Sequence, residues 1–486
     1  MKYLVPMRPY RRLSLFKASG LDEAFIYSQV KTMAKKAKKI KTNKGLKLEI
    51  VNPNSAGIDV SSTEMQVCVP EERDGENNRR FGTFTQDLHL ISDWLKACGI
   101  ETVAMESTGV YWVQLYMILE SEGFDVLLVN AKAIKNISEK KTDRVDAETI
   151  MVLHSYGLLR ASFQPQNHAR RIRNVSRHRD GLLKASSREV LHMQKAMELM
   201  NIKLGNVISD ILGKSGQEII RAILAGERDA RKLSALADPR CKSPKETIAK
   251  SLQANWDEDL LFMLKQSYEL YVYYQNLMKD CDKQIEGILQ EYLKDVKPEE
   301  TSKPEQRAKK AKAQKNAVTI DIEKHAIRLW GVNAMRIPGV SEAALLRLAG
   351  ELGHDFTDKF DSYKQFCCWC NLTPNNKISG GKLQSSKIPK RKNPVGQILR
   401  SSANSLKTSK TPLGYYFRRI QAKSGYLPAI IATANKLGRI LYTMVKYKVE
   451  FDDSFTQTSE TEILRRKLIK TQRTLEKLQN QIKECG

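Results

Sequence analysis

Apolar and polar positions along the chain follow two periods, and the change between them divides the sequence. From Gly57 to about residue 130, five short runs read as strands, because they are rich in β-branched and aromatic residues: AGIDVSS, EMQVCVP, RRFGTFT, TVAMES and DVLLVN. DLHLISDWLKACG and a segment from about Tyr111 have the spacing of amphipathic helices. Three consecutive strands followed by alternating strands and helices predict a mixed sheet.

After Arg160 the pattern becomes helical. Residues 182–204 and 258–296 are long and free of turn signals, with apolar residues at helical spacing, and they predict a helical or coiled-coil arm. Four tyrosines of the second segment could stack on bases, although packing in a helical bundle fits their spacing better: Tyr268, Tyr271, Tyr273 and Tyr274.

The segment RIPGVSEAALLRLAGELG opens a mainly helical last domain. Its turn at Pro338 and Gly339, between two predicted helices, is typical of a helix-hairpin-helix, whose backbone amides can hold a phosphate. A plain helical hairpin has the same pattern. Near the end of the chain, apolar residues at alternating steps of four and three predict a short oligomerisation helix: Leu464, Leu468, Leu475, Leu478 and Ile482.

The predicted fold class is therefore α/β plus all-α. It comprises a ribonuclease H-like mixed sheet domain, a long helical arm and a helical C-terminal domain, although a doubly wound nucleotide-binding sheet would begin similarly. The expected boundaries are a basic N-terminal arm at 1–50, the sheet domain at 51–160, the helical coiled-coil arm at 161–300, a charged linker at 301–325, the C-terminal domain at 326–455 and a C-terminal helix at 456–486.

The charge balance indicates the kind of partner. The chain has 81 Lys and Arg against 55 Asp and Glu, a net charge of +26, which favours a polyanion such as nucleic acid. No apolar run reaches the roughly 18 residues of a spanning helix, and the N-terminus lacks a signal-peptide core, so we expect a cytoplasmic protein without a membrane partner. CCWC at 367–370 is only half of a zinc pattern, and buried apolar thiols are the better interpretation.

The stretch EKKTDRVDAETI places carboxylates inside this basic chain. Asp143 and Asp146 stand at i and i+3 at the start of a predicted helix, so they project the same way, although Asp143 alone could be a helix cap. Asp59 and Glu106 end two predicted strands, at the edge where open α/β sheets bind ligands. Four such carboxylates would repel one another without a cation. Their hard oxygen ligands suit Mg²⁺ or Mn²⁺.

These residues carry a family resemblance. GIDVSS, ESTGVYW and KTDRVDA resemble the three acidic blocks of the DEDD-type insertion-sequence transposases, over roughly residues 55–155. IPGVSEAALLRLAGELG, NLTPNNKISGG and GQILRSSAN resemble the transposase domain of that family. The resemblance implies a resolvase-like domain that acts on element ends and target DNA, a guiding bridge RNA, and a dimer or tetramer in the prokaryotic cytosol or nucleoid.

The resemblance also implies a nucleophilic serine, which corresponds to Ser379 here. A plain turn residue is the alternative, with Ser385 and Ser386 as the nearest competitors. The expected nucleic-acid contacts surround this segment: Lys377, Gly380, Gly381, Lys382, Lys387, Lys390, Arg391 and Arg400. The chain departs from the family in its longer N-terminal arm and in Pro394, which a first helical turn tolerates.

The sequence thus predicts a DNA transposase or site-specific recombinase. Asp59, Glu106, Asp143 and Asp146 would bind the metal, and Ser379 would attack the phosphodiester and allow strand exchange. Two alternatives stay open. A metal-dependent junction resolvase would use the same carboxylates with water as the nucleophile, and a non-catalytic nucleic-acid-binding scaffold would need only the basic surface.

Overall fold

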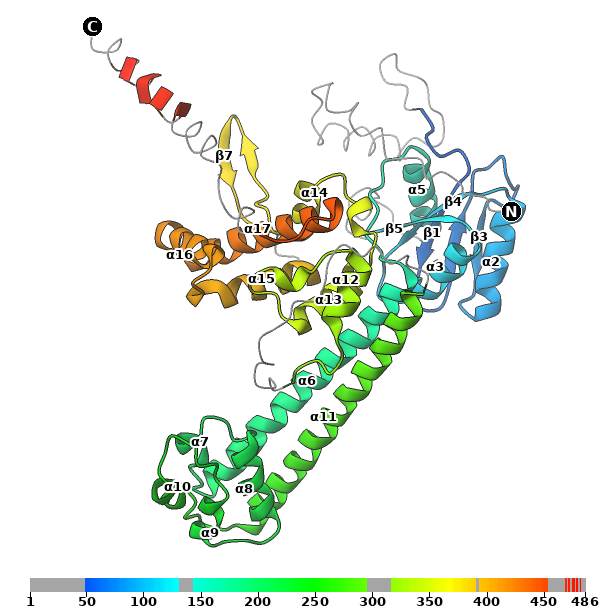
Figure 1. Cartoon of the computed structure of the whole chain (residues 1–486). Helices are drawn as coiled ribbons and strands as arrows, with labels where there is room; N and C mark the ends of the chain where they lie inside the picture. Colours follow the sequence, from blue (N-terminus) through cyan, green and yellow to red (C-terminus); the bar gives the residue numbers. More distant parts are fainter. Residues whose placement is uncertain are drawn as a thin grey trace. The chain divides into compact units, whose positions relative to one another are not determined.

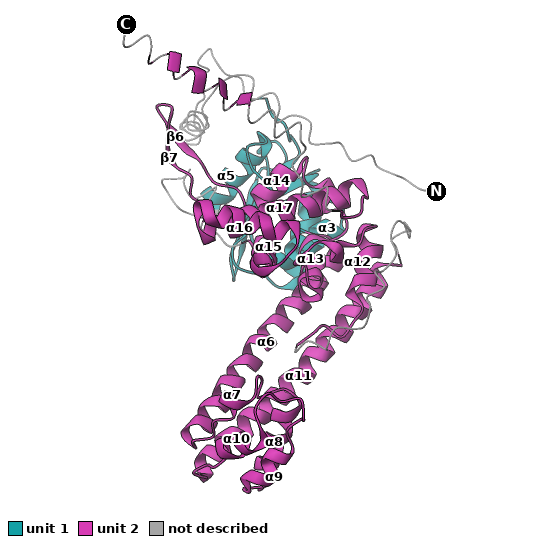
Figure 2. Ribbon diagram, turned by 60° about the vertical axis from the view of Figure 1, so that its left-hand side comes forward, with its two compact units in different colours: residues 1–164 teal, residues 165–486 magenta. Residues whose placement is uncertain are grey.

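The computed structural model describes residues 49–130, 143–294, 316–389 and 393–452, and parts of a helix between 468 and 481. The predicted N-terminal arm up to residue 48 and the part of the linker up to residue 315 lie outside these ranges. The chain forms two compact units, residues 1–164 and 165–486 (Figure 2). Among the described helices, none combines the length and apolar character needed to cross a bilayer.

Unit 1 is built around a five-stranded sheet in the order β3-β2-β1-β4-β5 (Figure 1). The strands are β1 (Ser55–Val60), β2 (Met65–Cys68), β3 (Asn78–Phe81), β4 (Thr102–Glu106) and β5 (Asp125–Val129). The first three form an antiparallel meander, and β4 and β5 extend the sheet in parallel from β1. This confirms the predicted ribonuclease H-like mixed sheet.

The two faces of this sheet are covered by different helices. The even-numbered residues of β1 point into the main core under α2 (Thr85–Ala97) and α3 (Trp112–Ser121). The opposite face lies under α5 (Asp143–Ser155), where Cys68 of β2 packs with Ala147 and Met151. Because side chains alternate along a strand, Gly57 and Asp59 belong to the α5 face.

Unit 2 contains a long antiparallel helix pair, α6 (Asn167–Leu199) and α11 (Glu258–Tyr292). The pair is tied by a buried ion pair between Arg179 and Asp282, whose side chains are 5% and 1% exposed. Helix α6 corresponds to the helical segment predicted at residues 182–204, and it begins earlier, at Asn167. As expected for bundle packing, Tyr268 and Tyr271 are buried, whereas Tyr273 is 58% exposed.

Four short helices form a cap with its own hydrophobic core where α6 ends and α11 begins: α7 (Leu204–Val207), α8 (Lys214–Leu224), α9 (Ala230–Ala235) and α10 (Lys245–Ser251). Figure 2 shows them gathered around one end of the pair. This cap was not predicted as a separate feature.

The rest of unit 2 is mainly helical, as predicted. Its helices are α12 (Ile322–Trp330), α13 (Glu342–Leu352), α14 (Tyr363–Trp369), α15 (Pro394–Ser405), α16 (Pro412–Ser424) and α17 (Tyr426–Tyr447), with the 3-10 helices η1 (Ala334–Arg336), η2 (Phe356–Asp358) and η3 (Leu406–Thr408). Trp330, Phe356 and Phe366 are fully buried and form its aromatic core. Pro394 is accommodated in the first turn of α15, capped by the Asn393 side chain.

The structure shows the setting of two features that were singled out in the sequence of this region, the turn at Pro338 and the cysteines of CCWC. The turn at Pro338 lies between η1 and α13, and the Ser341 hydroxyl accepts a hydrogen bond from the Ala344 amide to cap α13. Cys367 and Cys370 are buried thiols, and burial raises the pKa of Cys367 to about 12. These two neutral thiols support the interpretation as packing residues, whereas the third cysteine of CCWC, Cys368, is exposed and does not fit it.

Candidate active site

Asp59 and Glu106 leave neighbouring parallel strands at matching positions. The register of β1 and β4 ends with the pair Ile58 and Met105, and the two carboxylates are the next residues along. Paired positions of parallel strands share a face, so Asp59 and Glu106 both lie on the α5 face. Glu106 is buried, at 6% exposure, and one of its oxygens accepts a 2.6 Å hydrogen bond from the Thr108 hydroxyl.

The direction of α5 brings its acidic start toward the same edge. At its C-terminal end, the Ser155 carbonyl accepts hydrogen bonds from the amides of Val51 and Asn52, just before β1. Its middle packs directly on Gly57, so α5 runs antiparallel to β1. The N-terminal turn, which begins at Asp143 and includes Asp146, therefore lies toward the Asp59 end of the strand.

Close packing at Gly57 fixes this alignment. A Cβ added there would overlap the carbonyl oxygen of Ala147 and the amide nitrogen of Met151, and would come within 2.8 Å of the Met151 Cα. Only glycine lets the helix backbone approach the strand this closely. This role of Gly57 was not predicted from the sequence, although a glycine two residues before a strand-end aspartate is a signal that could have suggested it.

Polar neighbours of the carboxylates were also missed. Gln66 of β2 pairs with Asp59, and its side-chain amide donates to Asn78 Oδ1 at 2.6 Å. Asn78 in turn donates through Nδ2 to the Arg144 carbonyl at 3.0 Å, within the first turn of α5. The meander thus holds the acidic end of the helix by a hydrogen bond. The alternation of β2 identifies Gln66 as a polar position, but only the strand pairing shows that it lies beside Asp59.

The chemistry of these residues suits a hard divalent cation. Within the described residues, no Lys, Arg or His forms an ion pair with the buried Glu106, so its charge lacks a cationic partner there. The described side chains contain no group of three His, Cys, Asp or Glu already placed to hold a metal. The Asp143 side chain is outside that description. Oxygen ligands from β1, β4 and α5 fit Mg²⁺ or Mn²⁺ by type.

Ser379 lies in unit 2, on an exposed β-hairpin. The hairpin consists of β6 (Lys377–Ser379) and β7 (Lys382–Ser385), and Ser379 pairs with Lys382 across the turn. Gly380 and Gly381 have φ angles of +55° and +73°, as a tight two-residue hairpin turn requires. The glycine-rich turn was predicted from the sequence, but the strands that flank it were not.

The other predicted contact residues have different settings. Lys377, Gly380, Gly381, Lys382 and Lys387 are exposed on or beside the hairpin. Lys390 and Arg391 lie outside the described residues. Arg400 is partly buried on α15, where its guanidinium donates a 2.6 Å hydrogen bond to the Asn371 carbonyl.

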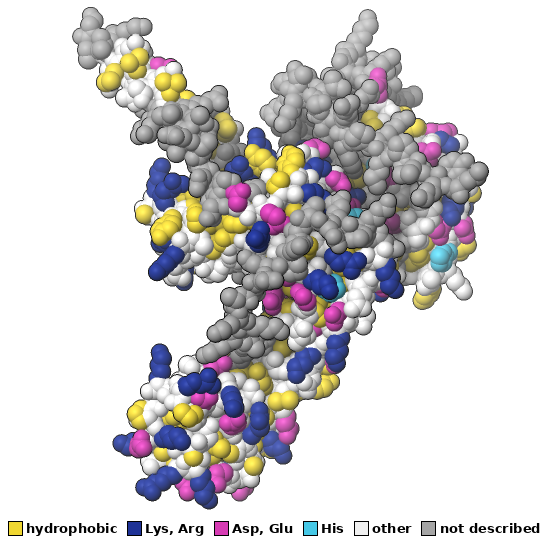
Figure 3. Space-filling view, in the orientation of Figure 1, with side chains coloured by type: hydrophobic (Ala, Val, Ile, Leu, Met, Phe, Trp, Pro, Cys, Tyr) yellow, Lys and Arg dark blue, Asp and Glu magenta, His cyan; other side chains and the backbone are white. Residues whose placement is uncertain are grey.

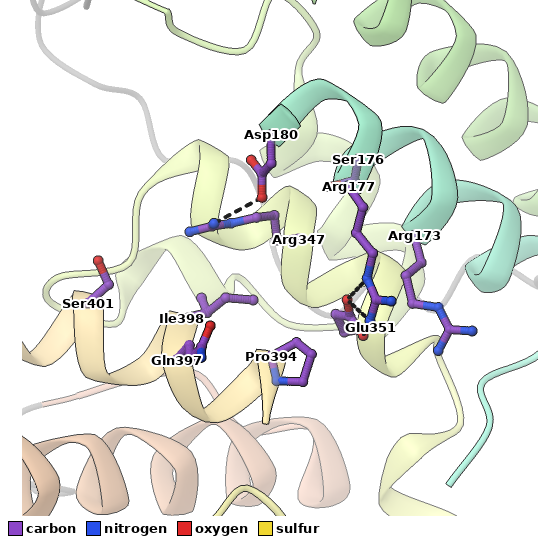
Figure 4. Close-up of a pocket in the computed structure, with 10 residues that line it drawn as sticks. All are labelled: Arg173, Ser176, Arg177, Asp180, Arg347, Glu351, Pro394, Gln397, Ile398 and Ser401. Carbon is purple, nitrogen blue, oxygen red and sulfur yellow. Dashed lines mark hydrogen bonds and ion pairs between the residues drawn. The ribbon is translucent and has the colours of Figure 1, made fainter. Parts of the chain in front are cut away.

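A pocket of about 320 Å³ opens between α6, α13 and α15 (Figure 4). Four of the charged side chains that line it form two pairs: Arg177 makes two hydrogen bonds of 2.8 and 2.9 Å to Glu351, and Arg347 donates to Asp180 at 3.1 Å. None of the predicted catalytic residues lines this pocket. Its paired charges support a role in joining α6 to α13.

Two family models match separate parts of the chain. Residues 56–202 match the DEDD transposase family of IS110, described as Transposase, and residues 332–412 match a family described as Transposase IS116/IS110/IS902 family. No curated protein matches the chain. The first match contains Asp59, Glu106, Asp143 and Asp146, and the second contains Ser379. Together the two matches support a DEDD-type insertion-sequence transposase, an enzyme that cuts and rejoins DNA.

Proposed function

We propose that this transposase exchanges DNA strands by metal-assisted attack of the Ser379 hydroxyl on a phosphodiester. The observation that supports the proposal is that Asp59 of β1 and Glu106 of β4 follow paired positions of neighbouring strands on the face that α5 covers, and that α5 begins toward the Asp59 end of β1. Carboxylates brought together from these segments would be suited to bind metal ions near a polyanionic substrate.

The residues that would hold the metal are Asp59, Glu106, Asp143 and Asp146. A divalent cation bound by them would stabilise negative charge on the scissile phosphate and favour the alkoxide of the attacking serine. The packing of α5 on Gly57 and the hydrogen bond from Asn78 to the Arg144 carbonyl would keep the helix-borne ligands in place. Mg²⁺ and Mn²⁺ both suit this ligand set.

In the proposed step, Ser379 Oγ forms a bond to phosphorus while the bond from phosphorus to one deoxyribose oxygen breaks. The serine proton leaves as the nucleophile forms, and the departing oxygen takes up a proton. One phosphoester replaces another, so the linkage retains the energy needed to join a new strand. Lys377, Lys382 and Lys387 are exposed near the serine and supply positive charge for the DNA backbone.

Guide RNA and oligomerisation belong to the same proposal. The net charge of +26 supports binding of a second polyanion, and the element-encoded RNA is the partner that the family resemblance implies. Because two DNAs must be cut and exchanged, the family resemblance implies a multimer. In the C-terminal helix, Leu468, Leu475 and Leu478 are between 53% and 60% exposed, which supports pairing with another copy. Leu464 and Ile482 lie outside the described residues.

One observation favours a second candidate, a metal-dependent nuclease. The carboxylates belong entirely to unit 1, whereas Ser379 stands on a hairpin of unit 2, so hydrolysis by water would need only the first unit. The nuclease would cut DNA without forming a bond between protein and DNA.

A recombination assay tests the proposal. Purified protein is incubated with Mg²⁺, element-junction DNA and target DNA, with and without the noncoding RNA of the element, and joined products are counted by sequencing. We expect joined products only with RNA, and none from the Asp59→Asn variant. Joining that does not depend on the RNA would remove the guide from the proposal. Cut ends without joining would favour the nuclease, and activity that survives in Asp59→Asn would remove the carboxylate site.

A further inference from the structure

A long stretch of unit 2 contains no acidic residue. Between Asp361 and Glu450 there is neither Asp nor Glu, but there are 17 Lys and Arg. The stretch covers α14, the hairpin and α15 to α17, and it carries more than half of the net charge of +26. In Figure 3, dark blue and yellow side chains gather at the end of the molecule that α16 occupies in Figure 1.

Part of this charge is organised around tyrosine rings. Lys436 Nζ of α17 lies 4.8 Å from the ring centroid of Tyr416 on α16, and the guanidinium carbon of Arg419 lies 5.4 Å from the same centroid. The guanidinium carbon of Arg439 lies 4.5 Å from the ring centroid of Tyr363 on α14. We call these five residues the cation–aromatic row; it joins α14, α16 and α17.

The charges of the row are close enough to repel one another. The pKa of Lys436 is lowered, first by burial and then by the nearby guanidinium groups of Arg439 and Arg419. Both arginines are exposed, and within the part of the chain that the structure describes neither forms an ion pair with Asp or Glu. An anion bound to the row would relieve this repulsion.

Exposed apolar surface lies next to the row. Residues 421–428, where α16 turns into α17, are all exposed. Among them Tyr426 is 42% and Leu427 is 72% exposed, although Tyr426 OH still donates to Asn404 Oδ1. Aromatic rings and arginine planes beside positive charge are the combination that binds unpaired bases together with their phosphates.

We propose that the cation–aromatic row binds a single-stranded segment of nucleic acid. Arg419, Lys436 and Arg439 contact successive phosphates, and the tyrosine and guanidinium planes of the row stack on bases. A duplex would meet only the charges, because its bases are already stacked inside the helix. Unpaired DNA at a cut site and a single-stranded loop of RNA share this chemistry. The inference requires that the chain handles nucleic acid, but it does not depend on serine chemistry.

The test measures binding by the full chain, without catalysis. Fluorescent single strands of DNA and RNA, each 20 nucleotides long, and the corresponding duplex DNA are titrated in the absence of divalent metal, and anisotropy is read at several salt concentrations. The variant removes three charges as Arg419→Gln, Lys436→Gln and Arg439→Gln. The matched control removes three exposed charges from α6 and α11 as Arg188→Gln, Lys195→Gln and Lys265→Gln.

We expect the row variant to bind single strands at least about 10-fold more weakly, with a salt slope reduced by about 0.7 for each lost phosphate contact. The control and duplex binding should change much less. The DNA and RNA arms show which single strand the row prefers. A double variant of the exposed Arg419 and Arg439 alone serves if the triple variant unfolds.

Three outcomes would overturn the inference. Equal losses in the row variant and the control would mean that only total charge matters. A loss confined to duplex DNA would assign the row to double-stranded DNA. Unchanged binding of single strands by the row variant would show that the row does not bind them.

Discussion

Gly57 of β1 lies directly against the backbone of Ala147 in α5, so closely that a Cβ on the glycine would overlap the Ala147 carbonyl oxygen. This contact sets how far α5 lies from the sheet. It therefore also sets the separation between Asp59, two residues further along the strand, and Asp146, one residue before Ala147 in the helix.

The first prediction concerns this contact. Gly57→Ala should push α5 away from β1, lower the free energy of unfolding by about 1–3 kcal/mol, and reduce DNA cleavage through displaced carboxylates. Gly75→Ala is the matched control, because nothing lies within 4 Å of a Cβ at that position. Thermal unfolding and cleavage are measured for both. Full cleavage by Gly57→Ala would show that the spacing of α5 is not critical.

The second prediction concerns the carboxylates themselves. Asp59→Asn and Glu106→Gln should each reduce Mg²⁺-dependent cleavage by about 100-fold or more, because each removes charge at the metal while keeping the size of the side chain. We also expect Mn²⁺ to raise the Tm of the unaltered protein, and both variants should abolish this rise. Asp93→Asn, an exposed carboxylate on α2, controls for the loss of charge. Retention of both the activity and the Mn²⁺ effect would contradict the assignment.

A third prediction tests the buried ion pair of the long helices. Asp282 accepts from Arg179 Nε at 2.7 Å, and also from the backbone amide and hydroxyl of Thr319 at 3.0 and 3.1 Å. Asp282→Asn should destabilise unit 2 by about 3–5 kcal/mol, since it leaves a buried guanidinium without its counter-charge. Asp280→Asn, two residues away in an exposed pair with Lys283, should cost less than about 1 kcal/mol. Urea unfolding followed by helical circular dichroism compares the two, and equal effects would contradict the account.

A fourth prediction concerns pH. His154 of α5 is buried, and this burial lowers its pKa from 6.5 to about 4. The Thr102 hydroxyl donates to the Asp125 carbonyl, so it accepts from His154 Nε2, and the imidazole is neutral. Because the folded pKa is below the unfolded one, this stabilisation is fully present above pH 6.5 and is lost as the pH falls toward 4, by up to about 3 kcal/mol.

Hydrogen exchange measures this loss. Amides of α5 should lose protection between pH 6.5 and 4 after correction for intrinsic exchange rates. His154→Gln should weaken this pH dependence, whereas His178→Gln, an exposed histidine of unit 2, should leave it unchanged. An identical pH dependence in His154→Gln would exclude His154 as its source.

Much of unit 1 could be predicted from sequence because its strands alternate clearly. The same alternation predicted that Asp59 and Glu106 lie at one edge of the sheet. In the structure they follow the last paired residues of β1 and β4. The placement of α5 could not be predicted in this way. It depends on the missing side chain of Gly57 and on the hydrogen bond from Asn78 to the Arg144 carbonyl, which are contacts between distant segments.

Two features of unit 2 escaped prediction for physical reasons. The first half of α6 is rich in arginine and histidine, and ion pairs such as that between Arg179 and Asp282 take the place of apolar contacts, so the apolar period is weak there. The hairpin is exposed on both strands, and Ile378 and Leu383 are 66% and 59% exposed. A strand without a buried face leaves little alternation to read.

The most direct test of the proposed chemistry is a search for DNA joined covalently to the protein. The protein is incubated with Mg²⁺, the noncoding RNA and labelled element-junction DNA, and then run on a denaturing gel beside the variants Ser379→Ala, Ser385→Ala and Asp59→Asn. Serine attack predicts an adduct in the unaltered protein and in Ser385→Ala, and none in Ser379→Ala or Asp59→Asn. DNA that is cut without any adduct, and cut equally well by Ser379→Ala, would contradict serine attack and establish hydrolysis by water.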